Sequence, residues 1–347
     1  MKRNLLILAA AAALLLLMFG IYRSTLPTSA LLSPEEAQTQ LEDLAARFSA
    51  AIENERDVQP LLEPVDKIVA QQPGLRDGQK LLGQIHAQLG DIQPAYDAFA
   101  AALMIDPNEA HLQNLAGTAA MMLDDVTAAE THHRLAAQQS PDDPVLLVPL
   151  ADVLLKTQRW DEARNILLRV LELDSTLHQP HAALSDVYAG RGEEGDDVRA
   201  IDQMEKALSK LPLTAEWAEQ RVVYARKLAR LFSERDEPME AIAVLDSLSP
   251  EARFSPDVLR ETAEYLEANG QVVLAGLQYE MALKARPTEA DYAAESALWY
   301  LKGGDRGAAQ SMMERLESID PRHMTLEVLR TRFNVESVAP GPGTDAE

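Results

Sequence analysis

The most constraining feature of this sequence is a stretch of 34 residues that is built to fold as two packed helices and then recurs along the chain. In residues 76–109, Gly83 and Ala95 are small where two helix backbones would approach closely. Phe99 can fill the space above them, and Pro107 would end the second helix because proline cannot continue the hydrogen-bond ladder. The stretch therefore predicts one helix-turn-helix unit.

The same spacing continues beyond this first unit. Pro141 follows Pro107 after 34 residues, and Gly117 and Ala129 keep the phase between them. A fixed period of this length indicates a stacked array, in which each helix pair buries its apolar face against its neighbours. The composition agrees, because 47% of the residues are apolar but only 5% are aromatic, which suits helices better than sheets.

Several positions of the unit agree with one known family. Glycine stands at the eighth position, alanine at the twentieth and twenty-seventh, an aromatic residue at the twenty-fourth and proline at the thirty-second, so residues 76–109 resemble the tetratricopeptide repeat. Residues 159–163 and 171–174 are also typical of that family. The resemblance implies an all-α fold, a right-handed α-solenoid of antiparallel helix pairs.

We expect the whole chain to follow one order of segments. This order is a transmembrane signal-anchor over 1–23, a tether over 24–34, a degenerate first helix pair over 35–75, about seven repeats over 76–323 that are irregular near 193–253, a capping helix over 324–335 and a disordered tail over 336–347.

The N-terminus predicts the membrane anchor. Residues 5–21 carry no charge and follow Lys2 and Arg3. A helix over residues 4–22 would span about 28 Å, close to the thickness of a bilayer core. Because two basic side chains precede the span and one follows it, we expect the N-terminus in the cytoplasm and the array in the periplasm of a bacterial-type inner membrane. The alternative is cleavage near residues 28–30, which would leave a soluble periplasmic protein.

The charge balance excludes some partners. The chain has 32 basic and 55 acidic residues and a formal charge of -23, so the phosphates of nucleic acid would be repelled. Cysteine is absent, which excludes disulfides and thiol catalysis. Apart from the anchor, the partner expected on these grounds is a protein or a peptide.

No motif for catalysis, a cofactor or a metal is found in the sequence. It lacks the HExxH, GxxxxGK[ST] and GxSxG patterns. His132 and His133 are adjacent, so on a helix they point about 100° apart and cannot share a metal; the twenty-fourth position predicts that His133 is a packing residue. The acids of residues 193–197 lack a calcium-binding spacing and are expected to form a solvated loop. We predict no enzyme, no cofactor and no metal.

The resemblance implies a peptide-binding groove lined by the first helix of each repeat, mainly at positions two, five, nine, twelve and thirteen. Transferred onto this sequence, these positions are His111, Asn114, Thr118, Met121, Met122, Val145, Val148, Asp152 and Leu155, with Arg226 and Arg230 in the irregular fifth repeat. Apolar members would form an adaptable strip, Asn114 could hold a bound backbone, and the two arginines could hold a carboxylate.

One family-specific site is not expected. Members that bind chaperone tails hold the carboxylate with basic and asparagine residues at set positions. Lys80 occupies the first of these, but Gln84, Leu115, Val145 and Pro149 stand at the others.

Together these features predict a non-enzymatic, membrane-anchored scaffold or adaptor that binds a protein or peptide outside the cytoplasm, with an assembly factor as one concrete form. An accessory subunit of a secretion, pilus or polysaccharide-export machine is the alternative. A repeat-containing enzyme is the competing class.

Overall fold

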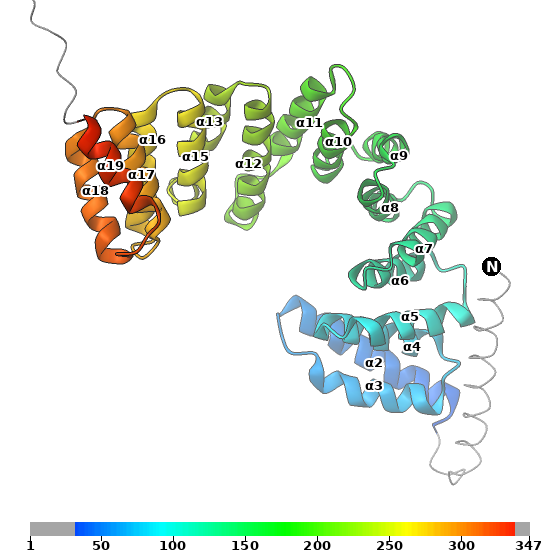
Figure 1. The fold of residues 1–347 in the computed structure, drawn as a ribbon. Helices are drawn as coiled ribbons and strands as arrows, with labels where there is room; N and C mark the ends of the chain where they lie inside the picture. Colours follow the sequence, from blue (N-terminus) through cyan, green and yellow to red (C-terminus); the bar gives the residue numbers. More distant parts are fainter. Residues whose placement is uncertain (1–31, 337–347) are drawn as a thin grey trace, which may run out of the picture. The chain divides into compact units, whose positions relative to one another are not determined.

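The computed structural model describes residues 32–336, which form helices joined by short loops and contain no strand (Figure 1). The all-α prediction is confirmed for this range. The predicted transmembrane segment over 1–23 and nearly all of the predicted tail lie outside the described residues. No helix between residues 32 and 336 is long and apolar enough to cross a membrane.

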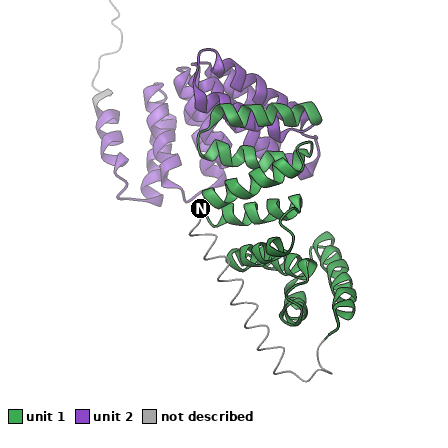
Figure 2. Ribbon diagram, turned by 90° about the vertical axis from the view of Figure 1, so that its right-hand side faces the viewer, with its two compact units in different colours: residues 1–175 green, residues 176–347 purple. Residues whose placement is uncertain are grey.

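The chain divides into two compact units, residues 1–175 and residues 176–347 (Figure 2). The helices of the first unit are α2 (Pro34–Glu53), α3 (Gln59–Gln71), α4 (Arg76–Leu89), α5 (Ile92–Ile105), α6 (Ala110–Met122), α7 (Val126–Gln139), α8 (Pro144–Lys156) and α9 (Trp160–Leu173). Each odd-numbered helix packs against the even-numbered helix before it.

The second unit is built in the same way. Its helices are α10 (Gln179–Arg191), α11 (Asp196–Lys210), α12 (Ala218–Glu234), α13 (Pro238–Asp246), α14 (Pro250–Arg253), α15 (Pro256–Ala268), α16 (Val272–Ala285), α17 (Ala290–Lys302), α18 (Arg306–Ile319) and α19 (Thr325–Glu336). A single 3-10 turn over Ala215–Trp217 precedes α12. The irregular stretch thus contains a shortened second helix, α13, followed by the one-turn helix α14.

The first described helix begins where the sequence predicts. The backbone amide of Glu36 donates to the Ser33 hydroxyl at 3.2 Å, and the amide of Ser33 donates to the Glu36 carboxylate at 2.9 Å. Pro34 occupies the first turn, where its missing amide proton costs nothing. This reciprocal cap satisfies two amides that the helix cannot pair internally.

The tight helix pair predicted for residues 76–109 is also observed. A Cβ atom on Gly83 would lie 2.5 Å from the Phe99 ring, and Phe99 and Ala95 are almost fully buried. In the next helix pair, α6 and α7, the ring of His133 packs against a glycine as Phe99 does. A Cβ atom on Gly117 would lie 2.7 Å from that ring. The prediction that His133 is a packing residue is confirmed.

The expected solvated acidic loop is wrong for one of its residues. Asp196 is only 1% exposed, and both of its carboxylate oxygens accept hydrogen bonds from Arg191 at 2.8 Å. Arg199 donates a third bond at 2.8 Å and the Glu193 amide a fourth at 3.1 Å. These donors hold the pKa of Asp196 well below its usual range. Asp196 therefore fixes the α10–α11 loop instead of facing water.

The last helix closes the apolar end of the second unit. Leu326 and Leu329 of α19 are buried against the preceding helices. Arg306 donates to the Phe333 carbonyl at 2.6 Å and lies over the ring of the same residue. Such a cap is what a terminal repeat needs to stay soluble.

Candidate functional site

The predicted groove residues of the first unit form a strip along α6 and α8, which we call the α6/α8 strip. Two consecutive repeats show the same pattern, in which positions two and nine are exposed and positions five and twelve are half-buried. Exposed members are His111, Thr118, Met122, Val145 and Asp152, and half-buried members are Asn114, Met121, Val148 and Leu155. The register transferred from the family thus marks one solvent-facing stripe on each helix.

Polar members of the strip already bond within the unit. The Asn114 side-chain carbonyl lies 2.9 Å from Nδ1 of His133, and the Thr118 hydroxyl donates to the Asn114 backbone carbonyl at 3.0 Å. His111 lies 3.7 Å from the Asp143 carboxylate. The side-chain oxygen of Asn114, a residue expected to hold a bound backbone, is therefore engaged, and the role of Asn114 in binding stays a prediction.

A chain of hydrogen bonds fixes the ring of His132, beside the buried ring of His133. The Gln113 amide nitrogen donates to the Pro107 carbonyl at 2.9 Å, so its oxygen accepts from Nδ1 of His132 at 2.7 Å. Nε2 of His132 is then free to accept from the Tyr96 hydroxyl at 3.3 Å. Burial lowers the pKa of His132 and lowers that of His133 to about 4. Both rings are therefore uncharged at neutral pH.

The exposed apolar members of the strip lie at its two ends. Met122, the last residue of α6, is 64% exposed, and Val145, the second residue of α8, is 65% exposed. Consecutive first helices run in the same direction because each is followed by an antiparallel partner. Met122 and Val145 therefore flank the strip, with half-buried Met121 and Leu155 nearer its floor.

The two predicted arginines of the second unit line one hollow between α12 and α15, which we call the basic hollow. Its volume is about 500 Å³, and its lining residues are Val223, Arg226, Lys227, Arg230, Arg260, Glu261, Glu264 and Tyr265. The structure thus brings Arg226 and Arg230 together on one wall. Whether they bind a ligand stays a prediction.

Most charges of the basic hollow are paired. Nε of Arg226 lies 2.9 and 3.0 Å from the two oxygens of Glu261, and its Nη2 also contacts that carboxylate. Arg260 donates to Glu264 at 2.7 Å. Lys227 lies 2.9 Å from Asp186 of α10. Arg226, which was predicted as a ligand-binding residue, is therefore already committed to Glu261.

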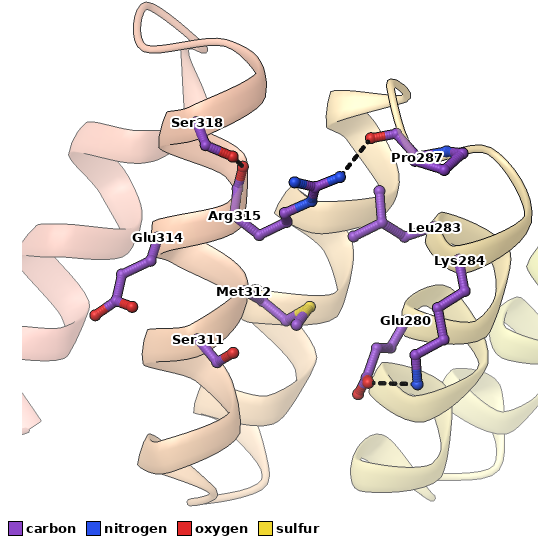
Figure 3. A pocket seen from close by; sticks show the side chains of 9 residues that line it. All are labelled: Glu280, Leu283, Lys284, Pro287, Ser311, Met312, Glu314, Arg315 and Ser318. Carbon is purple, nitrogen blue, oxygen red and sulfur yellow. Dashed lines mark hydrogen bonds and ion pairs between the residues drawn. The ribbon is translucent and has the colours of Figure 1, made fainter.

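A second hollow of the second unit, of about 620 Å³, lies between the second helices α16 and α18 (Figure 3). Glu280 and Lys284 pair at 2.8 Å, and Arg315 donates to the Pro287 carbonyl at 3.2 Å. Its two carboxylates balance its two cations, and Leu283 is buried at its floor. The lining therefore gives this hollow no preference for a cationic or an anionic ligand.

Arg260 and Tyr265 were missed by sequence reasoning. The signal for Arg260 existed, since it is the fifth position of the repeat 256–289, as Arg226 is in the preceding repeat. Tyr265 is not at a groove position, so only the structure reveals it. Within residues 32–336, no three or more histidine, aspartate or glutamate side chains gather to hold a metal ion.

Comparisons with known proteins identify the kind of repeat in two segments of the chain. Residues 81–109 and residues 120–185 match the tetratricopeptide repeat family. The chain contains tetratricopeptide repeats (TPRs). The resemblance seen in the sequence is therefore confirmed for these segments. The basic hollow lies outside them. No curated protein matches the chain.

Solved TPR structures share the fold. The C-terminal part of a TPR repeat-containing protein from Cytophaga hutchinsonii is 14% identical, covers 71% of this chain and 97% of that chain, and has a TM-score of 0.58. A TPR protein from Parabacteroides merdae is 13% identical, covers 71% and 93%, and has a TM-score of 0.53. YrrB, described as a TPR protein with an unusual peptide-binding site, is 19% identical, covers 57% and 97%, and has a TM-score of 0.43. At these identities the likeness to the Cytophaga hutchinsonii and Parabacteroides merdae structures concerns the fold alone.

Proposed function

We propose that this protein is a non-enzymatic TPR scaffold that binds a protein or peptide partner through its first helices. The observation that carries the proposal is the exposure of Met122 and Val145 on α6 and α8, at 64% and 65%. Large apolar side chains gain about 1.5–3 kcal/mol on full burial, so covering these two would contribute roughly 1–2 kcal/mol each. Flexible methionine suits a surface that must fit several side chains.

The membrane location is part of the same proposal. Residues 1–23 would anchor the chain in a bacterial-type inner membrane, and the repeats would gather partners on the periplasmic side as an assembly factor. Its support is the uncharged run of residues 5–21 after two basic residues.

A second mode of binding has its own observation. Val273, Leu274 and Leu277 of α16 are 40%, 46% and 39% exposed on a second helix, so an outer face could contact a larger machine. This version corresponds to an accessory subunit of a secretion, pilus or export assembly.

The test is capture of the partner from intact membranes by crosslinking with a tagged full-length chain. We expect Met122→Ala with Val145→Ala to weaken capture at least tenfold, because both exposed anchors of the strip are lost. Met104→Ala is the matched control, since Met104 is 50% exposed on the second helix α5. Unchanged capture by the folded double variant would overturn binding through the α6/α8 strip. Loss of capture in the variant with Leu274→Ala and Leu277→Ala would favour binding through the outer face. A chain lacking residues 1–30 tests the anchor separately.

A further inference from the structure

The basic hollow differs chemically from the rest of this acidic chain. Four basic side chains and two carboxylates line it, although the chain as a whole carries a formal charge of -23. Its lining residues belong to the groove positions of two consecutive first helices and their neighbours, so a segment lying along the first helices of this unit would pass over it. Each of its four cations lies within ion-pair distance of a carboxylate, so the binding of an anionic group depends on how firmly each pair is held.

Arg230 is the cation of the hollow that is left available. Arg226 and Arg260 each bind a glutamate that lines the hollow, and Lys227 binds Asp186. Arg230 is 64% exposed, and its contact with Glu234 in the same helix is 3.6 Å, beyond hydrogen-bond distance. Among residues 32–336 it makes no closer contact with a carboxylate, so its guanidinium donors face solvent.

Tyr265 supplies a second donor to the hollow. Its side chain is only 9% exposed and lines the hollow, yet its hydroxyl has no hydrogen-bond partner among the described residues. Burial, with Glu261 and Glu264 nearby, raises the pKa of Tyr265 to about 12, so the hydroxyl keeps its proton at neutral pH. The hydroxyl is not among the buried polar atoms that lack a partner between residues 32 and 336, so it reaches the solvent of the hollow and can donate to a group that enters there.

We propose that the basic hollow binds a carboxylate of the partner peptide, held by the guanidinium of Arg230 and the hydroxyl of Tyr265. A carboxylate has two oxygens and can accept from both donors at once. The bidentate Arg226–Glu261 pair keeps Glu261 from repelling it, because both glutamate oxygens are occupied. The volume of about 500 Å³ leaves room for the residue that carries the carboxylate. This inference rests on the proposed function, since it names the chemistry of one segment of that partner.

The experiment uses three fluorescein-labelled peptides and the full-length chain in detergent. One peptide has two glutamates in a glycine-serine background and an amidated C-terminus, the second has glutamines in their place, and the third has glutamines with a free C-terminal carboxylate. Fluorescence anisotropy measures binding. We expect the glutamate peptide, the free-terminus peptide or both to bind at least tenfold more tightly than the amidated glutamine peptide. Which of the two binds tells a side-chain carboxylate from a chain terminus.

Two conservative variants test the named contacts. We expect Arg230→Gln to weaken binding of the carboxylate peptide at least tenfold, and Tyr265→Phe to weaken it several-fold while keeping the ring that packs in the core. Arg47→Gln is the matched control. Arg47 is 56% exposed and lies 3.8 Å from Asp43, and Arg230 is 64% exposed and lies 3.6 Å from Glu234; in both pairs the carboxylate is one helical turn away. Circular dichroism verifies that each variant folds.

Some results would overturn the inference. They are equal binding of all three peptides, no binding by the wild-type chain, or unchanged binding of the carboxylate peptide by Arg230→Gln. The scaffold proposal is tested with variants of the α6/α8 strip, so it can fail while the hollow still binds carboxylate, and the hollow can fail while the strip still captures a partner.

Discussion

The two units are built from the same kind of helix pair but bury different ionisable groups. The first unit buries His133 and half-buries His132 as neutral rings behind the partly apolar α6/α8 strip. The second half-buries Glu267 and Glu295, and burial raises the pKa of both carboxylates, that of Glu267 to about 7. The backbone of a repeat therefore fixes where side chains point, while the residues at those positions decide which chemistry each unit offers. The α6/α8 strip presents apolar and polar side chains, whereas the basic hollow presents mainly cations.

The largest expected effect concerns the buried charge of the second unit. Asp196→Asn would replace the buried carboxylate that pairs with Arg191 at 2.8 Å by a neutral amide, while the exposed Glu193 carboxylate stays 3.3 Å from Arg191. Breaking a buried ion pair from one side costs about 3–5 kcal/mol, and we expect about 3 kcal/mol here because water can reach the loop. Hydrogen exchange should show the loss in residues 176–336. Asp197→Asn, at an exposed pair, is the control and should cost under about 1 kcal/mol.

The first unit should instead be sensitive to volume. Ala95→Leu places a larger side chain between α4 and α5, where Ala95 is fully buried beside Phe99 and Gly83. We expect a loss of about 1–3 kcal/mol in the free energy of unfolding, measured by urea denaturation. Ala87→Leu, on the exposed side of α4, should be close to neutral. A neutral Ala95→Leu would mean that the helix pair is packed differently.

The two units should respond to pH in opposite directions. The folded pKa of His133, about 4, lies below its ordinary value of about 6.5, so the first unit is most stable above pH 6.5 and loses stability as the pH falls toward 4. The folded pKa of Glu267, about 7, lies above its ordinary value of 4.5, so the second unit loses stability as the pH rises from 4.5 through 7.

Urea unfolding followed by hydrogen exchange across this pH range would compare the units within one molecule. His133→Phe should flatten the response of the first unit, since phenylalanine fills the same space without titrating. Glu267→Gln should flatten that of the second. Parallel pH profiles in the two units would contradict the contrast between them.

The smallest effect on stability and binding is expected at Lys80, the basic residue of the first unit that stands at a carboxylate-binding position of chaperone-binding family members. Lys80 is paired with Glu109, and such partly exposed pairs contribute about 0–1 kcal/mol. Lys80→Gln should therefore change stability little and leave binding of a carboxylate peptide unchanged, unlike Arg230→Gln. Equal losses in the two variants would show that both units recognise carboxylates.

Sequence reasoning predicted what depends on spacing. The glycine and aromatic positions of residues 76–109 and the Ser33 cap follow from local rules, and both are observed. It did not predict that Asp196 is buried, because that depends on which of several nearby arginines folds back onto the loop. Tyr265 was missed because it does not stand at a groove position, so its place in the hollow follows only from how α12 and α15 pack. The register of the repeats can be read from the sequence, whereas the ion pairs and hydrogen bonds between side chains cannot.

The most direct test of the central claim is site-specific photocrosslinking in cells at two matched threonines. Thr118 lies on the α6/α8 strip and Thr131 on the second helix α7; both are exposed, and each donates its hydroxyl to the carbonyl four residues earlier. A photoreactive amino acid at residue 118 should crosslink a defined partner, and the same group at residue 131 should not. Crosslinks from residue 131 alone, or equally from both positions, would contradict binding through the first helices.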